Sequence, residues 1–301
     1  MNKPSPALGV AEIGLLLVVA VWGVNFAIIK VPLEVIPPFA VNALRFTVSA
    51  VVLTGLHLWQ SSRQGLSPLA DLRRFPVAVI VLGLLAHVVY QTGFILGVDR
   101  VTAGVAALLI SSNPIWTSVV GHLKGIDRLR AGGWIGLAIG IAGVGLVIAG
   151  QTSGREGGDV LGVLMMLVAA AAWGLSTVFS RPLFDRGATP LGLTVSGLWV
   201  AYPILLAMGL WEIGAVDWTL VGSPEWAAIG YSGALSTGVA YWIWYVAVKK
   251  VGPSLTAAFS NLVPFVGVGA GAVLLNESVQ AIELVGGALI IAGLVVMRSS
   301  R

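Results

Sequence analysis

Apolar stretches of membrane-spanning length recur along almost the whole chain. A helix needs about 20 mostly apolar residues to cross the hydrocarbon core of a bilayer, and ten segments meet this requirement. They cover residues 8–29, 37–59, 76–98, 101–123, 132–150, 160–180, 189–211, 225–248, 252–275 and 280–297. The connections between them are short and hold most of the charged residues. The sequence therefore predicts an all-α polytopic membrane protein with ten transmembrane helices.

Composition supports this fold class and argues against several functions. Only 10% of the residues are charged, whereas soluble domains carry about 25%. The chain has no cysteine and three histidines, so we expect no metal and no other cofactor. The net charge of +4 does not indicate nucleic-acid binding, because the basic residues are scattered between apolar runs. The first apolar run, from Leu8 to Ile29, is too long for the core of a cleavable signal peptide.

The distribution of basic residues predicts the orientation in the membrane. Lys and Arg accumulate in cytoplasmic loops. If the N-terminus is cytoplasmic, 13 of the 17 basic residues lie on the cytoplasmic side. The outer side then holds Lys30, Arg100 and Arg155, and Arg45 lies within a span. We therefore expect both termini in the cytoplasm.

The two halves of the chain repeat each other. A shift of 150 residues places Pro114 on Pro264, and a shift of 151 places the pair Trp22-Gly23 on Trp173-Gly174. Residues 1–150 and 151–301 are thus predicted to form two repeats of five helices. Because five is an odd number, the second repeat must be inverted relative to the first. Inverted repeats are typical of secondary transporters, which bind substrate near the membrane midplane between the repeats.

Several of these segments also resemble a known family. The stretches AVWGVNF (20–26) and NALRF (42–46), the segments that end in NP (113–114) and VP (263–264), and the tail at 274–297 are similar to those of ten-helix EamA-type permeases. These permeases belong to the drug/metabolite transporter superfamily, and the resemblance covers essentially the whole chain. It implies export of a small organic solute across the bacterial inner membrane. Cargo differs within the family and includes amino acids, nucleosides, purines and cationic drugs, and one branch exports aromatic amino acids.

One departure from related transporters bears on energy coupling. Small four-helix drug exporters of the superfamily carry an essential carboxylate in the first helix, eight residues before a lysine. Here the residue eight positions before Lys30 is Trp22. We therefore expect facilitated, gradient-driven export and not proton antiport. An enzyme or a channel is not expected, because His57, His87 and His122 lie on different predicted helices and no filter motif is present.

Two prolines mark candidate hinges. Pro114 and Pro264 lie about a dozen residues into their helices, and a proline there removes a backbone hydrogen bond and kinks the helix. Small polar residues precede both prolines; the candidates for substrate binding are Ser112, Asn113, Ser260 and Asn261. The two kinks either serve packing alone or let the two helices face each other across the substrate.

Other polar residues within the spans should face the interior, because exposing them to lipid is costly. Arg45, with Asn42 one turn before it, could hold a substrate carboxylate, act as a barrier at the outer gate, reach the outer interface or bind backbone carbonyls. His87, Tyr90 and Gln91 share one stripe of a helix and form either a hydrogen-bond cluster or a cavity wall, where His87 could titrate. By the same reasoning, weaker candidates are Trp22, Asn25, Trp173 and Thr177.

The stretch YWIWYVAVKK (241–250) combines aromatic residues with two terminal lysines. The lysines mark the cytoplasmic end of a helix, so Trp242 and Trp244 are expected in the aromatic belt at the membrane interface. Tyr241 shares a face with Trp244 and with Tyr245, so this side of the helix could instead line the cavity. Ser236 and Thr237, one turn away, would continue that face.

Glycine ridges at residues 132, 136 and 140, and at 286 and 293, predict closely packed scaffold helices at the back of each repeat.

These features together predict a central cavity between the repeats and transport by alternating access. The favoured cargo is an amino acid, with an aromatic side chain as the more specific expectation. The alternatives are cationic drugs and nucleosides or purines. The expected partners are the small-molecule substrate and the lipid bilayer, and we expect a monomer.

Overall fold

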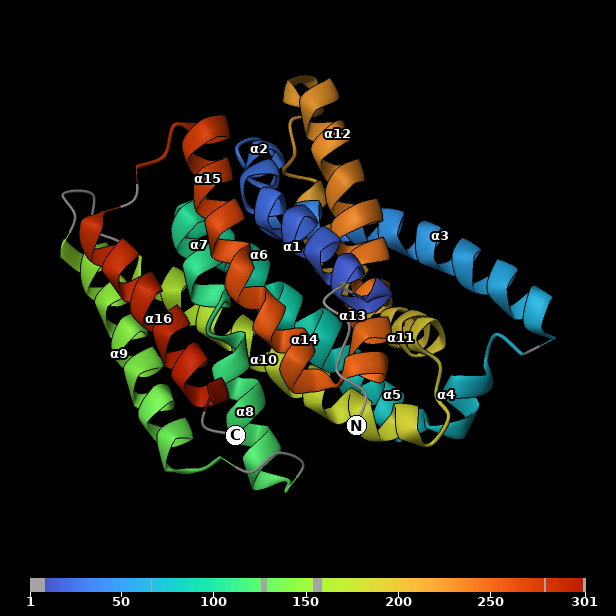
Figure 1. The fold of residues 1–301 in the computed structure, drawn as a ribbon. Helices are drawn as coiled ribbons and strands as arrows, with labels where there is room; N and C mark the ends of the chain where they lie inside the picture. Colours follow the sequence, from blue (N-terminus) through green and yellow to red (C-terminus); the bar gives the residue numbers. More distant parts are fainter. Residues whose placement is uncertain (1–8, 66, 126–128, 154–158, 279, 300–301) are drawn as a thin grey trace.

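The computed structural model describes residues 9–65, 67–125, 129–153, 159–278 and 280–299, and all regular structure in them is helical (Figure 1). The first half contains α1 (Val10–Ile28), α2 (Lys30–Leu33), α3 (Pro38–Gln64), α4 (Ala70–Arg74), α5 (Pro76–Gly83), α6 (Tyr90–Arg100), α7 (Ala103–Ile110), α8 (Asn113–Leu123) and α9 (Ala131–Ser153). The second half contains α10 (Val160–Asp185), α11 (Pro190–Ile213), α12 (Ser223–Tyr231), α13 (Ala240–Val251), α14 (Pro253–Phe259), α15 (Val263–Leu275) and α16 (Ala281–Ser299).

Eight helical stretches of the described chain are long and apolar enough to cross a membrane. They are Val10–Leu33, Pro38–Gln64, Pro76–Arg100, Ala103–Leu123, Ala131–Gly150, Val160–Asp185, Pro190–Ile213 and Leu255–Leu275. An apolar helix over Ala281–Met297 is shorter, and helical structure also runs from Ser223 to Val251. An all-helical fold with many apolar helices is thus confirmed, whereas the count of ten spans stays a prediction.

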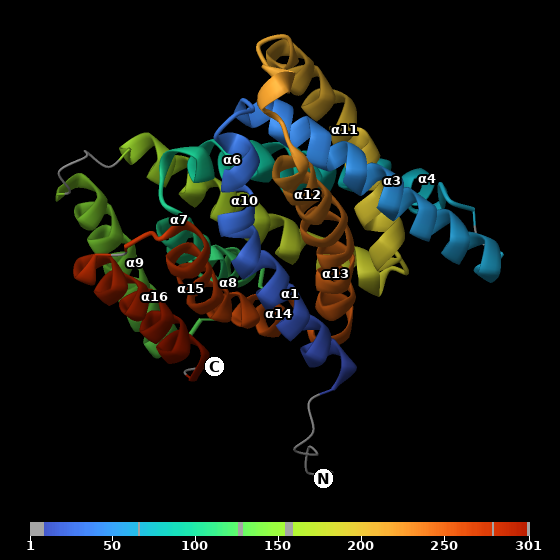
Figure 2. The ribbon, with the colours of Figure 1, turned by 90° about the horizontal axis from the view of Figure 1, so that it is seen from above.

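Helices from opposite halves pack in antiparallel pairs. In the pair of α3 and α11, the Thr47 hydroxyl lies 3.0 Å from the Tyr202 hydroxyl, and Trp199 Nε1 donates to Thr54 Oγ1 at 2.9 Å. Residue numbers therefore rise along α3 as they fall along α11. Figure 2 shows these two helices together on one side of the bundle, with α9 and α16 on the other side.

Glycines bring α9 and α16 together in a second antiparallel pair. A Cβ atom built on Gly136 would lie 2.3 Å from the carbonyl oxygen of Gly293, and one on Gly143 would lie 2.5 Å from that of Gly286. Only residues without a side chain permit such an approach of two backbones. The predicted close packing is confirmed, and each glycine ridge has the other helix as its partner.

The helices that carry the two predicted hinges are interrupted. α7 ends at Ile110, and α8 begins at Asn113 with Pro114 in its first turn. Between α14 and α15, residues 260–262 form a short 3₁₀ segment, and Pro264 lies in the first turn of α15. Proline suits a first helical turn, because the N–H that it lacks would have no partner there. Both prolines are buried.

Two π-helical segments lie at matching positions of the repeats. One covers Leu84–Val89, between α5 and α6, and the other covers Ser232–Val239, between α12 and α13. A π segment inside a helix is rare and is frequently found at functional sites. The sequence patterns that predict the helices did not predict these two segments.

Candidate functional site

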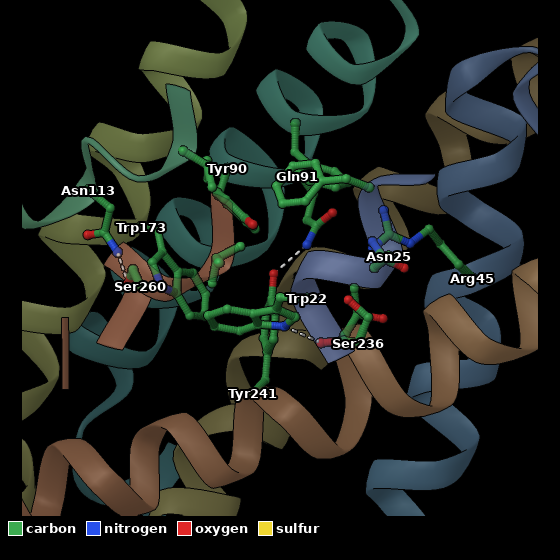
Figure 3. A pocket seen from close by; sticks show the side chains of 15 residues that line it. Trp22, Asn25, Arg45, Tyr90, Gln91, Asn113, Trp173, Ser236, Tyr241 and Ser260 are labelled. Atoms are coloured by element: carbon green, nitrogen blue, oxygen red, sulfur yellow. Dashed lines mark hydrogen bonds between the residues drawn. The ribbon is translucent and has the colours of Figure 1, made fainter. Parts of the chain in front are cut away.

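A pocket lies at the centre of the bundle and receives side chains from both halves of the chain (Figure 3). Nine of the fourteen predicted substrate-binding residues line it: Trp22, Asn25, Arg45, Tyr90, Gln91, Asn113, Trp173, Tyr241 and Ser260. Ser236 and Thr237, expected to continue the face of Tyr241, also line it. The structure therefore brings together residues that are up to about 240 positions apart in the sequence. They come from the continuous helices α1, α3 and α10 and from helices that the interruptions and π segments divide.

The pocket is largely filled by its own side chains. The gaps between its lining atoms total about 450 Å³, but only about 30 Å³ can hold the centre of a water molecule. The smaller volume is the one that limits a ligand, and it is enough for one or two waters. A substrate of amino-acid size can therefore enter only after lining side chains or helices move.

Arg45 is the one charged residue among the pocket-lining residues. The residue is 1% exposed, and its Nε and Nη1 atoms have no hydrogen-bond partner among the described residues. Its guanidinium carbon lies 5.3 Å from the ring centre of Phe94 and 5.9 Å from that of Phe46. A buried charge without a counter-ion is costly. Arg45 neither reaches the outer interface nor binds backbone carbonyls through these two atoms, so it can bind an anion that enters the pocket.

Other polar atoms around the pocket also lack partners in the described chain. The side-chain oxygens of Asn25 and Gln91 and the indole nitrogen of Trp173 are buried without a hydrogen bond. The Gln91 Nε2 group donates to the Tyr241 hydroxyl. Buried polar groups are normally paired, and each exception calls for an explanation. Two acceptors and one donor thus accompany Arg45 in the same pocket.

The polar groups lie at two sides of an aromatic centre. Figure 3 shows Asn25 and Arg45 on one side of the pocket and Asn113 with Ser260 on the other. Asn113 Nδ2 donates to Ser260 Oγ at 3.4 Å, which joins the two interrupted helices directly. This contact places the residues that precede Pro114 and Pro264 across from each other, on one side of the pocket.

Indole and phenol rings fill the space between these two sides. The ring centres of Trp173 and Tyr241 are 4.6 Å apart, and those of Tyr90 and Trp173 are 5.0 Å apart. Trp22 Nε1 donates to the carbonyl oxygen of Ser236 at 2.9 Å, within the second π segment. Such edge and tilted ring contacts form a compact apolar wall with polar edges.

The expectation that Trp244 lies in the interfacial belt is wrong. Trp244 is 1% exposed, its ring centre lies 5.1 Å from that of Trp22, and its Nε1 donates to Thr177 Oγ1 at 3.2 Å. Trp242, on another side of the same helix, is only partly buried. Distance from the lysines indicated depth along the helix, but it did not indicate which face of the helix points inward.

Five predicted site residues do not line the pocket. Thr177 accepts a hydrogen bond from the indole nitrogen of Trp244. The Ser112 hydroxyl donates to the carbonyl oxygen of Leu109 at 2.7 Å, next to the helix interruption. His87 stacks on Tyr241, with ring centres 5.6 Å apart, and so lies outside the ring that borders the pocket.

The other two are amides. Asn42 is buried, and neither side-chain amide atom has a partner among the described residues, whereas Asn261 is only partly buried beside the pocket residue Ser260. Four apolar residues that line the pocket were not predicted from the sequence: Phe26, Phe94, Ile110 and Val263. An apolar side chain in an apolar helix gives no distinctive signal.

Comparison with known sequences identifies the family. The profile of the EamA-like transporter family matches this chain twice, over residues 9–149 and 160–299. The two matches cover nearly all of the chain. The first ends at residue 149 and the second begins at residue 160, close to the predicted division between residues 150 and 151. The chain therefore belongs to the EamA-like transporter family, within the drug/metabolite transporter superfamily, and it is a multi-pass membrane transporter.

Individual relatives extend over almost the same length. A protein of Salmonella typhimurium named "Probable amino-acid metabolite efflux pump" is 29% identical over 290 residues, which cover 93% of this chain and 91% of the relative. The "Uncharacterized inner membrane transporter YedA" of Escherichia coli is 25% identical over 266 residues, which cover 87% of this chain and 82% of the relative. One solved crystal structure aligns with a TM-score of 0.63 and 22% identity over 97% of this chain and 98% of that chain, which shows a shared fold.

Proposed function

We propose that this protein is a secondary transporter of the bacterial inner membrane that exports small organic metabolites, namely amino acids and most specifically aromatic ones. The observation that carries the proposal is Arg45, a buried cation that has no counter-ion among the described residues and lies in a pocket lined with aromatic rings. The name of the Salmonella relative, which refers to amino-acid metabolites, agrees with this choice.

The pocket offers a distinct partner for each part of an amino acid. The Arg45 guanidinium can bind the carboxylate through charge-assisted hydrogen bonds, which are stronger than neutral ones. The unpaired oxygens of Asn25 and Gln91 can accept hydrogen bonds from the ammonium group. The rings of Trp173 and Tyr241 provide apolar surface for an aromatic side chain. A cationic drug fits less well, because no carboxylate lines the pocket and Arg45 would repel it.

Alternating access is the transport mechanism that we propose. In this proposal two inverted repeats of five helices carry it out, with ten spans and both termini in the cytoplasm. The antiparallel pairs α3–α11 and α9–α16 support the inversion. The interruptions before Pro114 and Pro264 supply places where helix segments can change direction. Because the pocket has room for so little water, this conformation fits an occluded state between the inward-open and outward-open states.

Facilitated export remains the preferred form of energy coupling. The residues that line the pocket include no Asp, Glu or His that could carry a proton with each substrate. His87, the nearest candidate, lies behind the Tyr241 ring. The gradient of the amino acid itself would then drive export, and substrate binding would shift the population between the two open states.

Recognition of the substrate's carboxylate can be tested by comparing two ligands that differ only in that group. Purified protein in detergent would be titrated with tryptophan and with tryptamine, its decarboxylated analogue, by thermal shift and by counterflow in liposomes. A charge-assisted bond contributes about 1.5–3 kcal/mol, so tryptophan should bind at least about tenfold more tightly than tryptamine. Stronger binding of tryptamine or of a quaternary ammonium compound would contradict the proposal.

Two variants assign this preference to Arg45. Arg45→Gln should abolish the preference for tryptophan over tryptamine, whereas Arg45→Lys should keep part of it because the positive charge remains. Arg181→Gln is the matched control, since Arg181 lies outside the pocket and donates to the carbonyl oxygens of Val248 and Lys249. If Arg45→Gln retained the full preference, another group would have to recognise the carboxylate.

A further inference from the structure

A groove on the surface of the bundle lies outside the transport pocket. It runs between the start of α5 and the end of α10, and about 390 Å³ of it can hold the centre of a water molecule. This is more than ten times the corresponding volume of the central pocket. Val77, Val81 and Phe179 line the groove, and Arg74 and Arg186 lie at one end of it. Its walls are therefore apolar, and its charged residues are confined to one end.

Both arginines are held against the same aromatic ring. The guanidinium carbon of Arg74 lies 5.1 Å from the ring centre of Phe75, and that of Arg186 lies 5.0 Å from it. Arginine stacks well on an aromatic ring and keeps its hydrogen-bond donors available in the plane of the guanidinium group. Phe75 therefore fixes two cationic groups close together at the end of the groove.

The nearest acidic residues along the chain have other partners. Asp71, on the same short helix as Arg74, accepts hydrogen bonds from the Thr189 hydroxyl at 2.7 Å and from the Thr189 backbone N–H at 3.2 Å. Asp185, which precedes Arg186, lies 3.2 Å from Arg181. Neither Arg74 nor Arg186 has an ion pair within the described ranges of the chain. The two positive charges are thus available to an anion from outside the chain.

The position of the groove relates it to lipid. Val77 is 73% exposed and Val81 is 43% exposed, and both belong to the membrane-spanning stretch Pro76–Arg100. Arg74 and Arg186 lie just beyond the ends of the candidate spans Pro76–Arg100 and Val160–Asp185, and the ends of a spanning helix are where it meets the lipid headgroups. Lys124 Nζ lies 5.7 Å from the ring centre of Phe179 and adds a further positive charge near this wall.

We infer that this groove is a binding site for an anionic phospholipid. The phosphate would lie between Arg74 and Arg186, where both guanidinium groups can donate hydrogen bonds to its oxygens. One acyl chain would lie along Val77, Val81 and Phe179. A free phosphate ion would use only the charged end and would leave the apolar wall uncovered. Basic pockets between transmembrane helices on the cytoplasmic side are typical sites for anionic headgroups. This inference is independent of the cargo.

Lipid binding can be measured on the purified, delipidated full-length protein. Native mass spectrometry would compare phosphatidylglycerol with phosphatidylcholine of the same acyl chains, and inorganic phosphate would serve as the ligand without chains. A basic residue near an anionic lipid surface contributes about 1 kcal/mol, so two arginines should give phosphatidylglycerol roughly a 30-fold preference. Equal binding of the two lipids, or equal stabilisation by inorganic phosphate alone, would overturn the inference.

Variants separate the arginine pair from general charge. The double variant R74Q/R186Q should lose the preference for phosphatidylglycerol. The control R73Q/K250Q removes the same net charge from two exposed residues outside the groove and should keep it. Val81→Trp, which fills the groove and leaves both arginines in place, should weaken the binding of both phosphatidylglycerol and phosphatidylcholine. Thermal unfolding without lipid checks that each variant is folded. If the two double variants lost the preference equally, the site would not be specific.

Discussion

At the scale of single residues, the bond between Gln91 and Tyr241 joins the two halves of the chain beside the pocket. The Gln91 amide donates to the Tyr241 hydroxyl, and both side chains are buried. Tyr241→Phe keeps the ring and removes the acceptor, which leaves a buried donor unsatisfied at a cost of about 1–3 kcal/mol. We therefore expect a lower melting temperature for Tyr241→Phe in thermal unfolding.

A double-mutant cycle tests the reason for this loss. Gln91→Leu removes the donor, so adding Tyr241→Phe to it should cost much less than Tyr241→Phe costs alone. Replacing both partners of a buried hydrogen bond by apolar groups is often nearly neutral. If the two losses were additive, the bond would contribute nothing to stability, and the tyrosine would act only through its packing against Trp173.

At the scale of elements, α9 and α16 depend on glycine at their contact. Gly143→Ala would place a methyl group 2.5 Å from the carbonyl oxygen of Gly286 and 2.7 Å from the backbone nitrogen of Ile290. Backbone cannot move aside as a flexible side chain can, so the helices must separate. We expect a loss of about 1–3 kcal/mol in the free energy of unfolding, as for other overpacked contacts, measured by denaturation in detergent.

Gly145 provides a matched control on the same helix. A Cβ atom there would meet nothing within 4 Å, so Gly145→Ala should be neutral or slightly stabilising, because alanine favours helix more than glycine does. Equal destabilisation by the two substitutions would show that the helix requires flexible glycines and not a close contact with α16.

The same elements show how far the sequence predicts the structure. Apolar length predicted the helices, and the matched prolines predicted where two helices are interrupted, because both signals are local. The orientation of Trp244 and the π segment over Ser232–Val239 could not be predicted in this way. In a helix that is apolar on all sides, hydropathy does not distinguish the face toward lipid from the face toward the core. Most of the pocket residues that the sequence did predict are polar or occupy matching positions in the two repeats, as Trp22 and Trp173 do.

At the scale of the whole molecule, the proposed inversion of the repeats would determine which residues face each side of the membrane. At a shift of 150 residues, the end of the third predicted helix, Asp99-Arg100, is equivalent to the end of the eighth, Lys249-Lys250. Inverted repeats place these two ends on opposite sides of the membrane, whereas parallel repeats would place them on the same side. Asp99 at one end and Lys250 at the other are exposed in the structure, so a reagent in water can reach either position.

The absence of cysteine from the sequence makes this arrangement directly testable. Single variants Asp99→Cys and Lys250→Cys would be treated with a membrane-impermeant maleimide in right-side-out and inside-out vesicles. Because cytoplasmic loops are rich in Lys and Arg, we expect position 99 to react from outside and position 250 from inside. Both should react after permeabilisation, which controls for access. Reaction of both from one side would rule out the inverted arrangement, and with it a substrate site that two equivalent repeats expose alternately to each side.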